Sequence, residues 1–266
     1  MRRTLYATTG AGDLTTMGEL ERAGEAVNPE IQKLDAIAAY DRIAPVFREL
    51  SQARSAYLDA VDAEILKRVR GAKSLIDVGA GDGLRALKIA DQAGIQSVVL
   101  VEPSAGMRER IPAGFEVWDA PMEALPASLR RFDAVLCLWN VLGHVPAGRR
   151  IEGLKNLSRL CSESGCIVLD VVNRYNVAEC GAGAVLRRLV RDVMSASVED
   201  VPVRWRTGTG DVSTKGHAFS AREMTQLLRD AGLSVKERVA LNYGTGRRCG
   251  WTWSGSLLYI LRPAKQ

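Results

Sequence analysis

The sequence places three alternate glycines and two carboxylates where they could hold a small organic ligand. Gly79, Gly81 and Gly83 follow a short apolar run that has Asp77 near its end. Glycine tolerates positive φ angles and lets the backbone approach a ligand without interference from a Cβ atom. A second apolar run about 20 residues later leads into Glu102, where a carboxylate can accept hydrogen bonds from both ribose hydroxyls. Together these residues predict a strand–turn–helix–strand unit that binds a nucleoside.

The spacing of the third glycine distinguishes between two classes of cofactor. A dinucleotide-binding loop needs its third small residue at position 84, where this sequence has Leu84, and Gly83 comes one residue too early. Asp82 would also lie where a pyrophosphate has to approach, and like charges repel each other there. A nicotinamide-dependent oxidoreductase is therefore the less favoured hypothesis.

The run Asp-Val-Gly-Ala-Gly-Asp-Gly, residues 77–83, resembles motif I of the class I S-adenosylmethionine (SAM) methyltransferases. The cofactor of that superfamily carries a sulfonium and no phosphate. The resemblance extends over residues 40–262, and its specific part is 74–145. It implies an enzyme that uses SAM, with an α/β, Rossmann-like fold. That fold is a doubly wound seven-stranded sheet of order 3-2-1-4-5-7-6, in which the last strand is antiparallel.

The resemblance also assigns cofactor-binding roles. The glycine loop would lie under the amino-acid end of the cofactor, Asp77 would orient its ammonium group, and Glu102 would hold the ribose hydroxyls. Tyr40 belongs to a Tyr-Asp-x-x-Ala helix like that of many members acting on small molecules, and it would close over the methionine carboxylate. The expected cofactor-binding residues are Tyr40, Asp77, Gly79, Ala80, Gly81, Gly83, Glu102, Pro103, Met107, Asp119, Ala120, Met122, Leu138 and Trp139.

The adenine end of the cofactor is assigned to the segment after the third predicted strand. Asp119 would accept from the adenine amino group, the Ala120 amide would donate to a ring nitrogen, and Met122 would lie against the ring face. The backbone carbonyl near Leu138, after the fourth predicted strand, would face the cofactor ammonium.

Methyl transfer from a sulfonium needs alignment of the reactants and removal of a proton, so no nucleophilic side chain is required. His144 follows the fourth predicted strand and titrates near neutral pH, which makes it the candidate catalytic base. A purely loop-orienting role for His144 stays open. The expected contacts to the acceptor substrate are Asn173, Arg174, Tyr175 and Tyr243. The Arg174 guanidinium could pair with a carboxylate or phosphate of the acceptor.

His217 lies in a Gly-His-x-Phe sequence that resembles the family's turn before the last crossover helix, and it is therefore expected to be structural. Ser220 would cap that helix, and Glu223 would complete a capping box.

The composition is that of an ordinary globular protein, with 266 residues of which 47% are hydrophobic and 25% charged. The net charge of +5 comes mostly from scattered arginines, which favours a solvated basic surface over a nucleic-acid interface. Five cysteines without C-x-x-C spacing and two histidines argue against a metal site. No apolar run approaches the ~20 residues of a membrane span, and no apolar signal region follows Met1. We therefore expect a cytoplasmic enzyme with no membrane partner.

The chain is expected to form one SAM-methyltransferase domain over residues 31–266, preceded by a flexible arm, 1–30. Within the domain, residues 31–70 would form helices that cap the cleft, and 174–219 would form an insertion facing the substrate. Alternating patterns predict helices at 84–92, 104–110, 149–161 and 221–231. They predict strands at 73–78, 97–102, 115–118, 132–138, 165–172, 234–241 and 255–262.

The favoured function is transfer of a methyl group to a nitrogen or oxygen of a small-molecule acceptor by in-line displacement. No Asn/Asp-Pro-Pro-Tyr/Phe sequence follows the fourth predicted strand, no acid ends it, and no Pro-Cys pair is present. These absences disfavour methylation of nucleobase nitrogens, magnesium-dependent methylation of catechols, and methylation of cytosine carbon, respectively. An RNA methyltransferase and a catalytically inactive SAM-binding protein stay as alternatives. The acceptor and the oligomeric state are left open.

Overall fold

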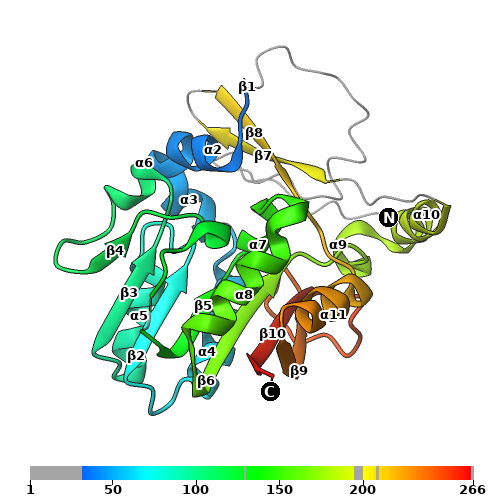
Figure 1. Ribbon diagram of the computed structural model, residues 1–266. Coiled ribbons are helices and arrows are strands. Elements are labelled where there is room, and N and C mark those ends of the chain that lie inside the picture. Colours follow the sequence, from blue (N-terminus) through cyan, green and yellow to red (C-terminus); the bar gives the residue numbers. More distant parts are fainter. Residues whose placement is uncertain (1–31, 129, 195–199, 208–209, 265–266) are drawn as a thin grey trace.

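The computed structural model describes residues 32–128, 130–194, 200–207 and 210–264. Its centre is a seven-stranded sheet of order β4-β3-β2-β5-β6-β10-β9, in which only β10 runs antiparallel to its neighbours (Figure 1). Numbered along the chain within this sheet, the order is 3-2-1-4-5-7-6, so the expected fold class is confirmed. The strands are β2 (Ser74–Val78), β3 (Ser97–Val101), β4 (Glu116–Trp118), β5 (Phe132–Cys137), β6 (Cys161–Val171), β9 (Leu233–Leu241) and β10 (Ser256–Pro263).

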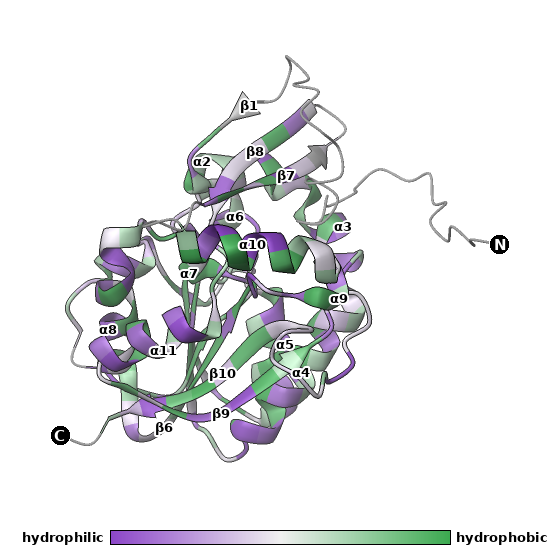
Figure 2. Ribbon diagram, turned by 90° about the vertical axis from the view of Figure 1, so that its right-hand side faces the viewer, coloured by the Kyte–Doolittle hydropathy of each residue, from purple (hydrophilic) through white to green (hydrophobic). Residues whose placement is uncertain are grey.

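The central strands are apolar on both faces because helices cover both faces of the sheet. One face packs against the helices α4 (Ser55–Arg68) and α5 (Leu84–Ala93). The other packs against α8 (Arg150–Leu160) and α11 (Ala221–Asp230). Figure 2 shows the resulting hydropathy pattern, with β10 largely hydrophobic and α11 largely hydrophilic on the side turned to solvent.

A second, smaller sheet lies above the central one and has the order β1-β8-β7 (Figures 1 and 2). Its strands are β1 (Gln32–Lys33), β7 (Val201–Thr207) and β8 (Gly210–Gly216). Trp205 of β7 and Val212 of β8 pack against Ile43 and Leu50 in a core of their own. The sequence did not predict this sheet, because its parallel β1–β8 pair joins two segments far apart in the chain.

The remaining elements surround the carboxyl ends of the central strands. The region expected to be an insertion contains α9 (Val177–Cys180), α10 (Ala182–Met194), β7 and β8. The expected arm, 1–30, lies outside the described residues. The N-terminal helices α2 (Ala36–Ile43) and α3 (Phe47–Gln52) are separated at Pro45 by a short 3-10 turn, η1 (Ala44–Val46). The other short elements are α6 (Ala105–Arg108), η2 (Met122–Ala124), α7 (Val141–His144) and η3 (Ala147–Arg149).

The expected boundaries differ from the observed ones mainly at β6. This strand begins at Cys161, directly after α8, whereas the sequence predicted a start at 165. The added residues include Glu163 and Ser164, whose exposed positions interrupt the apolar pattern that predicts a strand. Among the described residues, no helix is long and apolar enough to cross a membrane.

Candidate functional site

A cleft of about 530 Å³ opens at the carboxyl ends of β2, β3 and β5, where ligands bind in doubly wound sheets. Its floor is the turn after β2, and its walls include residues of α2, α3, α4 and α7. Ten of the expected site residues line it: Tyr40, Asp77, Gly79, Ala80, Gly81, Glu102, Pro103, Met122, Leu138 and Trp139. His144, the candidate base, lines it as well.

Backbone geometry and close packing both require glycine in the loop after β2. The φ angles of Gly79, Gly81 and Gly83 are +81°, +60° and +74°, which side chains with a Cβ rarely adopt. A Cβ at Gly79 would lie 2.3 Å from a methyl carbon of Val141, and one at Gly81 would lie 3.3 Å from the Phe47 ring. Gly79 and Gly81 line the cleft, whereas Gly83 begins α5 and packs away from it. The loop therefore forms a cradle that substitution with alanine would fill.

Glu102 follows β3, and each of its two carboxylate oxygens accepts from a different backbone amide. Its Oε2 accepts from the Gly81 amide at 2.8 Å and its Oε1 accepts from the Ser104 amide at 2.8 Å. The residue is 6% exposed, and burial raises the pKa of its carboxyl to about 7 despite these two donors. Each carboxylate oxygen keeps a second lone pair, so the side chain can still accept from a pair of hydroxyls.

Asp77 presents a carboxylate oxygen with no hydrogen-bond partner among the described residues. The residue is 4% exposed, and its buried Oδ1 makes no hydrogen bond. Burial raises the pKa of Asp77 to about 6. An unpaired buried acceptor is costly, and a cationic donor at this position would satisfy it. Asp77 and the glycine cradle therefore fit a ligand such as SAM, which carries an ammonium group.

Only some of the residues expected at the adenine end of the cofactor line the cleft. Met122 and Pro103 line the cleft, but Asp119, Ala120 and Met107 do not. The Asp119 side chain is 66% exposed and its Oδ1 accepts from Arg108 Nη1 at 2.7 Å. Ala120 and Met107 are buried in apolar clusters behind the wall.

A strained turn presents Trp139 to the cleft. Trp139 and Asn140 have φ angles of +54° and +64°, and among the described residues they are the only non-glycine residues with positive φ. The carboxylate of Asp170 accepts from the Trp139 amide at 3.1 Å and from the Tyr57 hydroxyl at 2.6 Å. The Asn140 side chain accepts from the Val172 amide at 3.0 Å. The turn is thus held by buried polar groups beneath it.

His144 and Tyr40 meet across the cleft. The Tyr40 hydroxyl lies 3.3 Å from Nε2 of His144, and Nδ1 lies 3.2 Å from the Lys215 carbonyl oxygen. Because a carbonyl can only accept, Nδ1 carries the proton of the neutral ring, and Nε2 is left to accept from Tyr40. Burial lowers the pKa of His144 below its usual value. His144 is thus held neutral, with its basic nitrogen toward Tyr40.

Asp41 anchors the helix that carries Tyr40. Its Oδ1 accepts from the Ser104 hydroxyl at 2.6 Å and from the Gly106 amide at 2.9 Å. These bonds lower the pKa of Asp41 and tie α2 to the turn after β3. No sequence motif gave a role to Asp41, Asp170 or Asn140. For Asp170 and Asn140, the available signal was a polar side chain near the carboxyl end of an apolar run, which locates such residues without revealing their partners.

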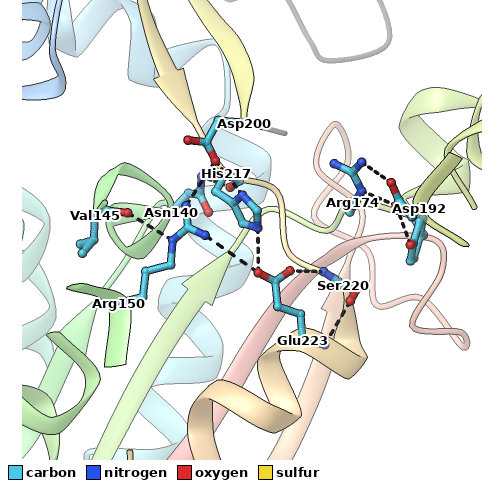
Figure 3. Close-up of polar contacts among 10 residues, drawn as sticks. Asn140, Val145, Arg150, Arg174, Asp192, Asp200, His217, Ser220 and Glu223 are labelled. Atoms are coloured by element: carbon cyan, nitrogen blue, oxygen red, sulfur yellow. Dashed lines mark hydrogen bonds and ion pairs between the residues drawn. The ribbon is translucent and has the colours of Figure 1, made fainter. Parts of the chain in front are cut away.

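The four residues expected to contact the acceptor do not line the cleft. The Arg174 guanidinium makes a bidentate ion pair with Asp192 of α10, at 2.5 and 2.6 Å (Figure 3). The Tyr175 hydroxyl donates to the same carboxylate at 2.7 Å. Asn173 donates to the carbonyls of Thr252 and Gly255. These side chains therefore hold α10 and the loop before β10.

Tyr243 lies behind the wall of the cleft. It accepts from Nε1 of Trp139 at 2.9 Å, and its ring packs on the Tyr57 ring at 4.8 Å between centroids. Tyr243 thus supports Trp139 from behind.

His217 belongs to a polar cluster beside the cleft (Figure 3). Its Nδ1 lies 2.8 Å from Asp200 and its Nε2 lies 2.8 Å from Glu223, and the residue is 3% exposed. Ser220 and Glu223 form the capping box at the start of α11, which confirms that prediction. The His217 carbonyl accepts from the Asn140 side chain at 3.1 Å, so this cluster supports the strained turn.

Charged side chains of α3, α4, α5 and the glycine loop form a further part of the cleft wall, to which the sequence motifs gave no ligand-binding role. Arg48 pairs with Asp82 at 3.0 Å, and Arg85 pairs with Asp62 at 2.6 Å. All four line the cleft. Within the described part of the chain, no group of three or more His, Cys, Asp or Glu side chains is arranged to hold a metal ion.

Comparison with known proteins identifies a family and a fold. The model of the family described as a methyltransferase domain matches residues 47–238. No curated protein matches the sequence significantly. Many solved structures match the fold, at low sequence identity.

Three of these structures illustrate the range. The CcbJ methyltransferase of Streptomyces caelestis is 17% identical, covers 87% of this chain and 100% of its own, and has a TM-score of 0.63. A SAM-dependent methyltransferase of Thermotoga maritima, a possible histamine N-methyltransferase, is 16% identical, with coverages of 85% and 99% and a TM-score of 0.59. The sugar N-methyltransferase KedS8 of Streptoalloteichus is 17% identical, with coverages of 98% and 100% and a TM-score of 0.54. At these identities the likeness establishes the fold.

Proposed function

The chain belongs to the SAM-dependent methyltransferases, and from that premise we propose that it methylates a nitrogen or oxygen of a small-molecule acceptor. It is an enzyme with SAM as its cofactor, as the resemblance in the sequence implied. The observation that carries the proposal is the contact between Tyr40 and His144, which places a neutral imidazole at the wall of the cleft.

The residues around the glycine loop are proposed to hold the cofactor. The unpartnered oxygen of Asp77 would accept from its ammonium group, and Glu102 would accept from the ribose hydroxyls. Trp139 and Met122 would supply apolar surface. When bound, SAM supplies a methyl group that is already activated on a sulfonium.

The proton of the acceptor is proposed to pass to Nε2 of His144 once the acceptor has taken the place of the Tyr40 hydroxyl at that nitrogen. Neutral imidazole is a suitable proton acceptor near pH 7, and the Lys215 carbonyl fixes the tautomer by accepting from Nδ1. Tyr40 would orient the imidazole ring of His144 and exclude water from its side of the cleft. The protein's main contribution is then alignment of the acceptor with the methyl group.

A small acceptor is supported by the limited volume of the cleft, about 530 Å³, one side of which is lined by residues of α2 and α3. Methyl transfer to nitrogen is favoured by the solved structures of similar fold, which include a sugar N-methyltransferase and a possible histamine N-methyltransferase. No described cation among those lining the cleft is without a carboxylate partner, which disfavours a nucleic-acid backbone as ligand.

The test begins with calorimetric titration of the purified protein with S-adenosylhomocysteine, using NADH as the control. Micromolar binding of the first ligand alone, followed by methylation of small amines or alcohols, is the expected result. NADH binding in place of S-adenosylhomocysteine, or tight binding without turnover of any nitrogen or oxygen acceptor, would contradict the proposal.

A further inference from the structure

The wall of the cleft has an excess of negative charge. Among the described residues that line it, the basic side chains are Arg48, Arg85 and Lys88. The acidic ones are Asp35, Asp59, Asp62, Asp77, Asp82, Glu102 and Glu123. Seven carboxyl groups therefore face three permanent cations, and burial keeps His144 neutral. Even without Glu102 and Asp77, whose pKa values burial raises to about 7 and about 6, five carboxylates outnumber the three cations. In a cleft with low-dielectric walls, such an excess attracts cations and repels anions.

Each of the three basic side chains already forms an ion pair within the protein. Arg48 pairs with Asp82, Arg85 pairs with Asp62, and Lys88 lies 3.3 Å from Asp59 and 3.5 Å from Asp62. A phosphate or carboxylate of the acceptor would meet no unpaired cation among these lining residues, so to gain an ion pair it would have to displace a carboxylate from one of these pairs. Anionic acceptors therefore meet both the excess negative charge and the loss of an existing ion pair.

Four carboxylates are left without a cationic partner among the lining residues. Asp77 and Glu102 are committed to the cofactor under the proposed function. Asp35 and Glu123 remain. Asp35 precedes α2, where its Oδ1 accepts from the Ala38 amide at 2.9 Å, and Glu123 lies in η2. They share the cleft wall with Tyr40 and His144, where the proposed base and therefore the acceptor would lie.

Arg174, the cation that the sequence suggested for an anionic acceptor, is not available for that role. Its side chain is 6% exposed and is paired with Asp192, whose pKa the guanidinium lowers. Arg149 lies beside Glu123 but donates to its backbone carbonyl at 3.0 Å, and Arg149 does not line the cleft.

We propose that the acceptor is a cationic amine that carries no phosphate or carboxylate, and that Asp35 and Glu123 select it. This inference rests on the proposed function and narrows it from nitrogen or oxygen to an amine nitrogen. The ammonium would bind near these two carboxylates, with no cationic imidazole beside it to repel it. After loss of one proton to His144, the amine nitrogen forms the new N–C bond while the C–S bond breaks. The sulfur keeps the bonding pair and leaves as a neutral thioether.

The experiment compares matched acceptors that differ in one anionic group. The pairs are ethanolamine and phosphoethanolamine, glucosamine and glucosamine 6-phosphate, and histamine and histidine, and the rate of S-adenosylhomocysteine release is measured. In each pair that reacts, we expect kcat/KM for the first member to be at least about tenfold higher. Higher ionic strength should raise KM for the amine, because salt screens the attraction.

A double variant and a control variant test whether Asp35 and Glu123 select the acceptor. Asp35→Asn combined with Glu123→Gln should raise KM for the best amine about three- to tenfold, with kcat and the affinity for S-adenosylhomocysteine nearly unchanged. The matched control is Glu163→Gln, an exposed acid of β6 that does not line the cleft and should change neither constant.

The outcomes separate the inference from the function on which it rests. Preference for the phosphorylated or carboxylated members, an unchanged KM in the double variant, or binding of S-adenosylhomocysteine without methylation of any amine would overturn the inference. Failure to bind S-adenosylhomocysteine at all would instead overturn the proposed function.

Discussion

The Tyr40 hydroxyl lies 3.3 Å from Nε2 of His144, although the two residues are 104 positions apart in the sequence. Tyr40 reaches this position because Asp41 ties α2 to the turn after β3. His144 is held from the other side by the Lys215 carbonyl of β8. The contact therefore joins the N-terminal helices, the central sheet and the smaller sheet at one point of the cleft. The proposed base is oriented by all three.

Replacement of His144 by glutamine should lower kcat by about 10²–10⁴-fold, because a side chain that can accept the proton is lost. Affinity for S-adenosylhomocysteine, measured by calorimetry, should stay within about threefold of the wild type. Tyr40→Phe should lower kcat less, since the imidazole remains. Equal losses of kcat and of cofactor affinity in His144→Gln would instead indicate that His144 only supports the loop.

The dependence of kcat on pH gives a second test of His144 as the base. A base acts when it is unprotonated, and burial lowers the pKa of His144 below its usual 6.5. The acidic limb of kcat that depends on His144 should therefore lie below pH 6.5 and be absent in His144→Gln. An acidic limb above pH 7 that disappears in this variant would contradict the assignment.

Affinity for S-adenosylhomocysteine should decrease as the pH falls through about 7 and then about 6. Burial raises the pKa of Glu102 to about 7 and that of Asp77 to about 6 in the unliganded protein. The ionised carboxylates are the better acceptors for hydroxyl and ammonium donors, so binding should release protons. Calorimetry in buffers of different ionisation enthalpy measures that release. No proton release at pH 6.5 would argue against both contacts.

Asp77→Asn should stabilise the unliganded protein at pH 8 while weakening its affinity for S-adenosylhomocysteine. The folded-state pKa of Asp77 is raised from 3.8 to about 6, so its contribution to stability is fully present below pH 3.8 and lost as the pH rises through 6. Above that pH, the buried charge costs on the order of 2–3 kcal/mol, which asparagine avoids.

Thermal melts at pH 5 and pH 8, with and without S-adenosylhomocysteine, measure both effects of Asp77→Asn. The melting temperature of the variant should exceed that of the wild type at pH 8 without ligand, and by less at pH 5. A variant that is destabilised at pH 8 yet binds as tightly as the wild type would indicate that Asp77 only ties down the glycine turn.

Arg174→Ala should destabilise the fold by about 3 kcal/mol without changing affinity for S-adenosylhomocysteine. It breaks a buried ion pair and leaves Asp192 with only the Tyr175 hydroxyl among its described hydrogen-bond partners. The matched control is Arg130→Ala, which breaks an exposed pair with Glu116 and should cost at most about 1 kcal/mol. Denaturant unfolding measures both. A stable Arg174→Ala variant with a raised KM for the acceptor would restore the substrate role suggested by the sequence.

Several of these relationships were accessible to sequence analysis because they are local. The apolar run before Gly79, the glycine spacing and the acid at the end of the next run depend on residues close together in the chain, and each leaves a pattern. The positions of the seven strands along the chain were predicted for the same reason, whereas their order in the sheet and the antiparallel last strand came from the resemblance to the methyltransferase family. The roles of Asp77 and Glu102 stay predictions, supported by an unpartnered oxygen and by two backbone donors.

The sequence by itself determined the strands and the glycine cradle, because strand and turn preferences act over a few residues, and the motif in that cradle indicated the family and with it the order of the sheet. Only the tertiary structure decided which polar side chains are free to meet a ligand. Arg174 and His144 both follow apolar strands, yet Asp192 neutralises the first and Tyr40 faces the second across the cleft. Ion pairs and the β1–β8 pairing join residues far apart in the chain, so no local pattern specifies them. The partners of a charged side chain, set by packing, decide whether it binds a substrate or holds the fold.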